Sequence, residues 1–394
     1  MLFYLILVLV ATVDATRVLD KHHLDAPTAD SLGCSVPGKQ NLSKAGRAVY
    51  FLTNSEVNSV ACIPIASDGT LFEGSSTITG GNGSSSISSE TGLAAGPDAL
   101  SSQGALTICG NDDPTNLVLL GEPATIPGDF PNTIAASLKN NLVCVGTTGA
   151  RAGISCASFS GTGLSEFDQL RPLNLHQTTP PIGTFNTISQ TFFSEDETRL
   201  FVTVKGNPTQ NTTGFFSVFP IMETSGKSRA LALRDFQSSP NGTAVLFGSV
   251  QIPGTSRIFV TDAAFGGAVL TLDSAGNHVS LLAKQQIDGQ QATCWAAFSK
   301  EQGTVFVTDV GVNRLIEMSS VNAEVISTVD LTNGDPGLID LQAVGEFVYA
   351  LSPGNGTTEP AITVIDIHRK QQIQHFQVSH LGASKSSQGL AIFE

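Results

Sequence analysis

Short runs of three or four consecutive apolar residues, each followed by a turn, recur along the whole chain. The clearest case is the segment 302–318 (QGTVFVTDVGVNRLIEM), in which the apolar run 305–307 is followed by Asp309 and Gly311 and then by a second run. This pattern predicts a β-hairpin. Because the first run has no polar alternation, both faces of its strand should be covered, as in a sheet packed between two others.

The spacing of these runs indicates a β-propeller. Similar phrases occur at residues 48–54, 142–147, 200–205, 258–262 and 347–352. From the first core residue of one run to that of the next, the intervals are 93, 58, 58, 47 and 42 residues. Intervals of about 40–58 residues that carry several short strands are typical of propeller blades. We therefore predict an all-β fold with a single propeller domain over residues 41–394.

The first interval is about two blades long, yet no complete blade is evident within it. A Gly/Ser-rich tract at 80–104 is followed by a short run at 105–110 and by NDDPTNLVLLG at 111–121, which supplies one outer strand at most. We expect seven ring positions, of which the one at about residues 72–140 is degenerate or truncated. A six-bladed ring is the alternative, and an error in the gene product near Cys109 would also shorten this region. The Gly/Ser-rich tract itself is expected to be mobile or O-glycosylated.

The two ends of the chain carry further signals. Residues 1–15 (MLFYLILVLVATVDA) predict a secretory signal peptide, since the apolar run is too short to span a membrane and has no charged stop-transfer flank. A membrane anchor is the alternative. Residues 16–40 are polar and irregular, and residues 389–393 (GLAIF) form a lone strand that is expected to pair into the first blade.

Sequons and cysteines agree with export into an oxidising compartment. The five N-glycosylation sequons are at Asn41, Asn82, Asn211, Asn241 and Asn355. Among the six cysteines, Cys144 and Cys156 lie six residues on either side of a turn centred on Ala150, which places them opposite one another in a hairpin and predicts a disulfide. Two buried free thiols are the alternative. The other four cysteines, Cys34, Cys62, Cys109 and Cys294, cannot be paired from their spacing.

The net charge excludes one class of partner. The chain has 34 acidic residues against 20 Lys and Arg, a formal charge of −14. An acidic surface repels phosphate backbones, so nucleic acid is not expected as a partner. No second long apolar segment predicts a membrane span. We expect a secreted monomer. It could be held at a cell wall by means other than a membrane span.

Several phrases resemble one known family. They are SQTFF (189–193), TVKGNPT (203–209), TGFFSVFP (213–220), SSPNGTAVLFGS (238–249), GTSRIFVTDAAFGGAVL (254–270) and SSQGLAIF (386–393). Together they resemble secreted fungal proteins related to 3-carboxy-cis,cis-muconate cyclase, within the lactonase family of seven-bladed propellers that includes 6-phosphogluconolactonase. Members of this branch resemble cell-surface glycoprotein antigens and adhesins as much as enzymes. The chain departs from them before the NDDPTNL phrase, where they carry a further strand, turn and strand.

The resemblance implies lactone chemistry without a cofactor, performed by a His, a Glu and Arg residues aimed into the channel. Where the family has its His, this chain has Asn132, Ser189 and Cys294. The seven histidines lie in the N-terminal tail (His22, His23), in the Pro-rich loop 161–185 (His176), and in turns or the last segment (His278, His368, His375, His380). That long loop is expected to cap a channel mouth.

Four residues remain as weak candidates for the site. Arg151 and Lys205 are cations that could hold a carboxylate, although a surface charge at a turn is the commoner explanation for each. Gln190 and Trp295 lie beside the His-equivalent positions and could line a pocket, while Trp295 could instead pack between blades.

Metal ligands and cofactors are not predicted. Asp262 and Asp309 both end an FVTD phrase, which indicates a structural Asx-turn repeated from blade to blade. A metal-dependent lactonase would need three or four carboxylate or amide ligands that meet at the channel, and spacing does not test this.

The sequence therefore favours a secreted lactonase-like propeller that binds host or cell-wall glycans or proteins. The alternative is an active cyclase or lactonase that acts on a small carboxylated lactone.

Overall fold

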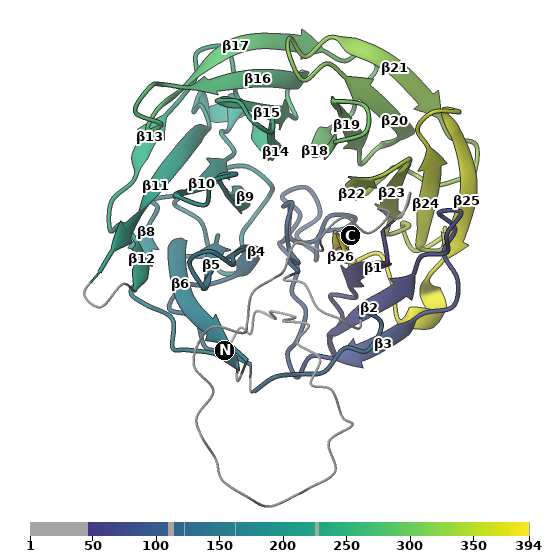
Figure 1. Cartoon of the computed structure of the whole chain (residues 1–394), viewed down its shortest axis with the longest axis horizontal. Coiled ribbons are helices and arrows are strands. Elements are labelled where there is room, and N and C mark those ends of the chain that lie inside the picture. The colour runs from purple at the N-terminus through teal and green to yellow at the C-terminus, as the bar shows by residue number, and fades with distance from the viewer. Residues whose placement is uncertain (1–45, 109–113, 122, 162, 225–227, 394) are drawn as a thin grey trace, which may run out of the picture.

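The computed structural model describes residues 46–108, 114–121, 123–161, 163–224 and 228–393. Within them the chain forms six antiparallel sheets set in a ring, as Figure 1 shows. The innermost strands, one from each sheet, are β26 (Gln388–Phe393), β4 (Pro131–Ser137), β9 (Ile188–Phe193), β14 (Leu246–Gln251), β18 (Thr293–Ser299) and β22 (Ile339–Val344). The predicted all-β propeller is confirmed.

The remaining strands follow outward from the centre. The second strands are β1 (Ala48–Leu52), β5 (Leu142–Thr147), β10 (Arg199–Val204), β15 (Arg257–Asp262), β19 (Thr304–Asp309) and β23 (Phe347–Ser352). The third strands are β2 (Ser59–Pro64), β6 (Gly153–Ser160), β11 (Phe215–Glu223), β16 (Gly266–Leu272), β20 (Val312–Met318) and β24 (Ala361–Asp366). The outer strands are β3 (Ser75–Ile78), β7 (Gly163–Leu164), β8 (Arg171–Pro172), β12 (Arg229–Leu231), β13 (Phe236–Ser238), β17 (Val279–Gln286), β21 (Val325–Asp330) and β25 (Gln371–Gln377). Two short 3₁₀ helices, η1 (Pro208–Gln210) and η3 (Ser379–Leu381), lie in connections.

The apolar runs became the second strands, which are buried on both faces. In β19 every residue after Thr304 is buried, whereas in the outer strand β21 no residue is fully buried. Apolar side chains of neighbouring blades interdigitate: Phe201 and Phe216 of one sheet share a cluster with Leu246 and Ile258 of the next. The core therefore lies between the blades, as the unbroken apolar runs predicted.

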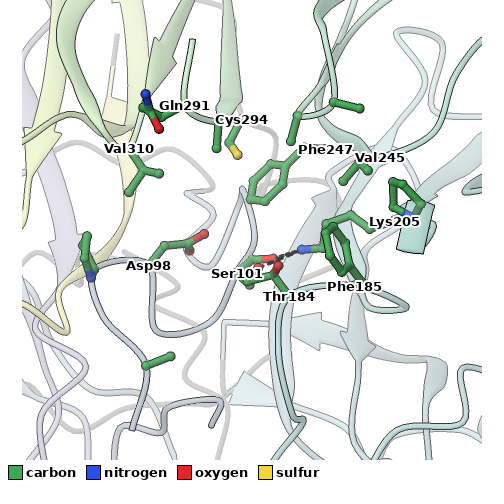
Figure 2. A pocket seen from close by; sticks show the side chains of 16 residues that line it. Asp98, Ser101, Thr184, Phe185, Lys205, Val245, Phe247, Gln291, Cys294 and Val310 are labelled. Carbon is green, nitrogen blue, oxygen red and sulfur yellow. Dashed lines mark hydrogen bonds between the residues drawn. The ribbon is translucent and has the colours of Figure 1, made fainter. Parts of the chain in front are cut away.

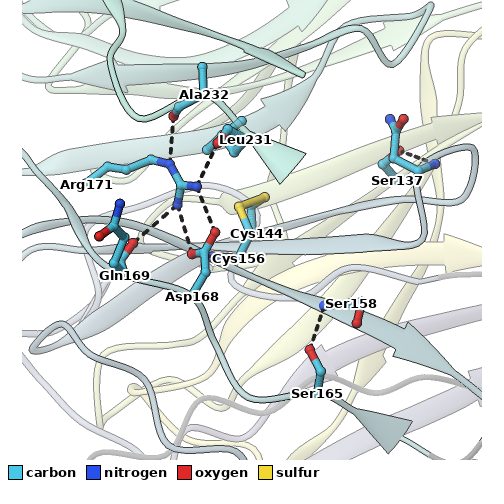
Figure 3. The surroundings of a disulfide bond; sticks show 11 residues. Ser137, Cys144, Cys156, Ser158, Ser165, Asp168, Gln169, Arg171, Leu231 and Ala232 are labelled. Atoms are coloured by element: carbon cyan, nitrogen blue, oxygen red, sulfur yellow. Dashed lines mark hydrogen bonds and ion pairs between the residues drawn. A yellow bond between two sulfur atoms is a disulfide. The ribbon is translucent and has the colours of Figure 1, made fainter. Parts of the chain in front are cut away.

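The ring is closed by the last strand. β26 pairs with β1 in antiparallel register, with Val49 opposite Ile392, so the predicted closure is confirmed. The predicted disulfide is also confirmed: Cys144 of β5 and Cys156 of β6 are direct cross-strand partners with a Cα–Cα distance of 4.1 Å (Figure 3). Cys294 is a buried free thiol, and the buried Cys62 thiol donates to the Pro114 carbonyl at 3.3 Å. Cys34, Cys109, Asn41 and the predicted segments 1–15 and 16–40 lie outside the described residues.

The irregular ring position lies between the first and second sheets, but its predicted bounds were too wide. β3 completes the first sheet and β4 begins the second, so the stretch without a named strand, among its described residues, is 79–130. Its middle crosses the centre of the ring in Figure 1. The predicted mobile tract at 80–104 is wrong for its last part, because residues 98–103 are all buried.

Candidate functional site

The centre of the ring is filled by residues 98–106. Their backbone meets the innermost strands on several sides: the Gln103 amide donates to the Ser189 carbonyl of β9 at 2.8 Å, and the Ile134 amide of β4 donates to the Gly104 carbonyl at 2.8 Å. On the opposite side the Leu100 amide donates to Oε1 of Gln388 in β26 at 3.1 Å. We call residues 98–106 the channel segment. It occupies the centre of the ring, into which the resemblance led us to expect the catalytic side chains to point.

The Gln103 side chain fixes this segment to β18. Its amide nitrogen donates to the Ala296 carbonyl at 2.8 Å, and its Oε1 accepts from the Ala296 amide at 3.0 Å. The Gln103 carbonyl accepts from the Thr133 hydroxyl of β4 at 3.0 Å. Because β18 is an innermost strand, its channel edge would otherwise present these two groups of Ala296 without a partner.

Two of the candidate residues hold the channel segment in place. The buried Lys205 ammonium donates to the carbonyl and, at 3.0 Å, to the hydroxyl oxygen of Ser101. The indole nitrogen of Trp295 donates to the Ser102 carbonyl at 3.2 Å, and its ring packs edge-on against Phe247 with centroids 5.2 Å apart. Both side chains thus point toward the channel, where the channel segment already uses their donors.

The other two candidates, Gln190 and Arg151, form hydrogen bonds with residues outside the channel segment. Gln190 of β9 accepts from the Ser249 amide of β14, which makes it a contact between blades. Arg151 lies at the hairpin turn with 65% of its side chain exposed and pairs with Asp129 at 2.7 Å. The structure therefore does not bring Arg151 and Lys205 together in one carboxylate site.

The three residues that stand where the family has its His are buried, and two of them donate hydrogen bonds to neighbouring strands. The side-chain amide nitrogen of Asn132 in β4 donates to the Ile188 carbonyl at 2.7 Å, and the Ser189 hydroxyl of β9 donates to the Leu246 carbonyl at 2.8 Å. Burial raises the pKa of the Cys294 thiol well above its usual value, so this side chain stays protonated and is a poor nucleophile. His176, in the Pro-rich loop, is exposed.

A cavity of about 300 Å³ opens at one mouth of the channel (Figure 2). Its lining includes Asp98, Ser101, Phe185, Lys205, Phe247 and Cys294. We call it the mouth cavity. Part of its wall comes from Thr184 and Phe185, so the loop 161–185 does contribute to a channel mouth as predicted. The cavity lies at the end of the ring where the innermost strands begin, and the channel segment forms its floor.

Two buried charges of opposite sign face each other across this floor. Desolvation by burial raises the pKa of Asp98 to about 7, an effect that the Lys205 charge partly offsets. Burial likewise lowers the pKa of Lys205 to about 8, against the attraction of Asp98. Lys205 Nζ also lies 4.4 Å from the Phe247 ring centroid, a cation–π geometry. Perturbed groups in a cleft make this the leading candidate site among the described residues.

The sequence did not point to Asp98. It lies in the Gly/Ser-rich tract, and its only signal was an acidic residue beside the short apolar run that contains Leu100. The Asx-turn interpretation of Asp262 and Asp309 is confirmed: Asp262 accepts from the amides of Ala244, Val245 and Ala264, and Asp309 from those of Gln291, Ala292 and Gly311. The described residues contain no group of three or more His, Cys, Asp or Glu side chains placed to hold a metal ion.

Comparison with known proteins supports the fold and no more. No protein-family model and no curated protein matches the chain. A solved structure from Bacteroides uniformis, described as a 6-phosphogluconolactonase, is 16% identical, with a TM-score of 0.50 over 84% of this chain and 83% of its own. A periplasmic gluconolactonase from Pseudomonas aeruginosa is 12% identical, with a TM-score of 0.47 over 84% and 83% of the two chains. A chain of a nidogen/laminin complex is 12% identical, with a TM-score of 0.49 over 88% of this chain and 98% of its own. The chain is thus similar in fold to lactonase-like propellers.

Proposed function

We propose that this chain is an exported surface glycoprotein that binds host or cell-wall glycans or proteins and does not turn over lactones. The observation that carries this proposal is the filled channel. Catalysis on a lactone needs an acid/base group and free cations aimed at the substrate. Here the Lys205 donors and the Trp295 donor bind the channel segment, and Arg151 is paired with Asp129 away from Lys205.

The positions of the sequons support the exported, glycosylated state. Asn82, Asn211, Asn241 and Asn355 are all exposed and lie in connections rather than strands. Asn211 and Asn355 follow second strands, Asn82 follows an outer strand, and Asn241 precedes an innermost strand. Because successive strands are antiparallel, all four connections lie at the end of the ring that bears the mouth cavity. Glycans there would leave the other end of the ring uncovered for a macromolecular partner. Among the described residues no helix is long and apolar enough to cross a bilayer.

The Asp98–Lys205 pair favours a second candidate function. A carboxyl with a pKa of about 7 in a cavity has the proton affinity of a general base, so a lactone hydrolase built on Asp98 is the rival. In that enzyme Lys205 would have to release Ser101 to hold a substrate carboxylate. The proposed binding role requires that it does not.

One assay separates the two functions. The secreted, glycosylated protein is mixed with 6-phosphogluconolactone, and separately with 3-carboxy-cis,cis-muconate, and the reaction is followed against a buffer blank. We expect rates equal to the blank, together with retention of the protein on a glycan array or on isolated cell-wall material. Opening of 6-phosphogluconolactone above the blank that Asp98→Asn abolishes would establish the hydrolase instead, and ring closure of the muconate above the blank would establish a cyclase.

A further inference from the structure

The mouth cavity is open to solvent and has the size of a small-molecule site. Thr184, Ala264 and Gln291, which contribute to its lining, are exposed and mark its opening. Its volume of about 300 Å³ is at the lower limit of typical ligand pockets. That volume is also about twice the roughly 150 Å³ of an apolar cavity that binds benzene. A ligand should therefore be a compact molecule of about two rings rather than a polypeptide segment.

The walls of this cavity are mainly apolar. Figure 2 shows Phe185 and Phe247 on the side nearest Lys205, with Val310 across the cavity from them. The Cys294 thiol between these sides behaves as a small apolar surface. Pro97, Pro208, Val245 and four alanines complete the apolar part of the lining. Water in contact with such walls is displaced favourably by an apolar ligand.

The charged and hydroxyl groups of the floor are already bonded within the protein or shielded. The Lys205 ammonium donates to the carbonyl and to the hydroxyl oxygen of Ser101. Asp98 is buried, and its Oδ1 has almost no surface that a molecule in the cavity could reach. These groups therefore give an entering ligand neither a donor nor an acceptor.

The backbone N–H groups at the rim are also occupied. The Ala263 amide donates to the Val245 carbonyl at 3.0 Å, and the Ala264 amide donates to Oδ1 of Asp262 at 3.0 Å. On the next blade the Ala292 amide donates to Oδ1 of Asp309 at 3.1 Å. A charged or strongly polar ligand would lose its hydration here without gaining hydrogen bonds from these donors.

We propose that the mouth cavity binds a small, uncharged and apolar two-ring compound through its apolar walls. The contact surfaces are Phe185, Phe247 and Val310, and no ion pair or hydrogen bond is required. This site goes beyond the proposed surface role and does not depend on it, because the cavity floor belongs to the channel segment. It also differs from a site for a carboxylated lactone, which would need an available cation.

The test uses the full secreted protein and three probes that share one ring system. Isothermal titration calorimetry, with the protein titrated into the probe, measures binding of naphthalene, of the anion 2-naphthoate and of the cation 2-naphthylmethylammonium. Measurement of naphthalene binding at several temperatures gives the heat-capacity change.

A pair of matched variants locates the site. Val310→Phe adds a larger side chain at a half-buried position of the cavity lining. Val321→Phe is the control, because Val321 is 55% exposed in the turn between β20 and β21, at the other end of the ring.

We expect naphthalene to bind at one site, with equal affinity in the unaltered protein and in Val321→Phe. Its heat-capacity change should be negative, as burial of apolar surface requires. Both ions should bind at least tenfold more weakly than naphthalene, and Val310→Phe should weaken naphthalene binding at least tenfold.

The proposal is overturned if naphthalene does not bind, if either ion binds as tightly, or if the heat-capacity change is not negative. It is also overturned if Val310→Phe leaves the affinity unchanged. The three probes are compared on the unaltered protein, so the class of ligand is decided without the variants. None of these results depends on the lactone assay or on glycan binding, so failure of this site and failure of the proposed function can be told apart.

Discussion

The side chain of Gln103 and the backbone of Ala296, 193 residues apart in the chain, form two hydrogen bonds of 2.8 and 3.0 Å. The amide of a side chain thus pairs with the free edge of an innermost strand as a neighbouring strand would. This pairing attaches the channel segment to a blade that is distant in the chain and helps to hold that segment in the centre of the ring.

Replacement of Gln103 by Leu tests this attachment. The variant keeps a similar volume but leaves the Ala296 N–H and C=O buried without partners, and each such group costs about 1–3 kcal/mol. We expect the free energy of unfolding to fall by about 2–4 kcal/mol, measured by urea denaturation. Gln237→Leu is the control, because the Gln237 side chain is exposed and donates to the nearby Asp235 carboxylate, so this variant should change the free energy of unfolding by a few tenths of a kcal/mol. Equal effects of the two variants would contradict the attachment.

Arg171 should matter to stability although it was not a candidate. Its side chain is 4% exposed, and its guanidinium donates to the Leu231 and Ala232 carbonyls and to both Asp168 oxygens (Figure 3). Arg171→Met removes every one of these donors while keeping an apolar stem. We expect a loss of about 2–4 kcal/mol in the free energy of unfolding, measured by denaturant titration.

Arg151→Met provides the matched comparison. The Arg151–Asp129 pair is exposed on its Arg side, and exposed ion pairs contribute about 0–1 kcal/mol. If Arg151 is only a surface charge, this variant should stay within about 1 kcal/mol of the unaltered protein. A larger loss than that of Arg171→Met would reverse our ranking of the two residues.

Removal of the disulfide should lower stability measurably. The bond closes a loop with a sequence separation of 12 residues, for which chain entropy alone predicts about 3 kcal/mol. We expect the double variant Cys144→Ala/Cys156→Ala to unfold at a lower denaturant concentration than the oxidised protein. Added reductant should shift the denaturation midpoint of the unaltered protein toward that of the variant. A variant that still responds to reductant would indicate another disulfide.

The sequence predicted the parts of the fold that depend on local pattern. Unbroken apolar runs specified the second strands, and the symmetric placement of Cys144 and Cys156 about a turn specified their pairing. The channel segment could not be predicted in this way. Residues 98–106 have no strand or helix period, and their polar groups find partners on blades that are distant in the chain, such as Ser189 and Ala296. Lys205 and Trp295 were only two of four weak candidates for the site, and their bonds to the channel segment were not predicted.

Stability should depend on pH through Asp98. Its pKa is about 7 in the folded protein and 3.8 in the unfolded chain, so between these values the folded state holds a proton that the unfolded state has released. Stability therefore falls as pH rises from about 4 to 7. Burial also raises the pKa of Asp340 to about 7, so this residue contributes to stability in the same direction. Lys205 acts oppositely, raising stability between about pH 8 and 10.5.

Urea midpoints measured from pH 4 to 7 should decline less in Asp98→Asn than in the unaltered protein. Asp68→Asn is the control, since Asp68 is exposed and hydrogen bonds from Thr70 lower its pKa. It should keep the decline of the unaltered protein. An identical decline in Asp98→Asn would show that Asp98 is not protonated in the folded state at these pH values.

Hydrogen exchange over the channel segment tests the central claim most directly. The Gln103 amide is bonded to Ser189 in β9, whereas the Gly92 amide, in the same Gly/Ser-rich tract, is bonded only within an exposed turn. Peptide-level exchange of the native protein should show residues 98–106 protected as strongly as β9, while residues 88–93 exchange early. If residues 98–106 exchange as fast as residues 88–93, the channel is open in solution and the filled-channel account is contradicted.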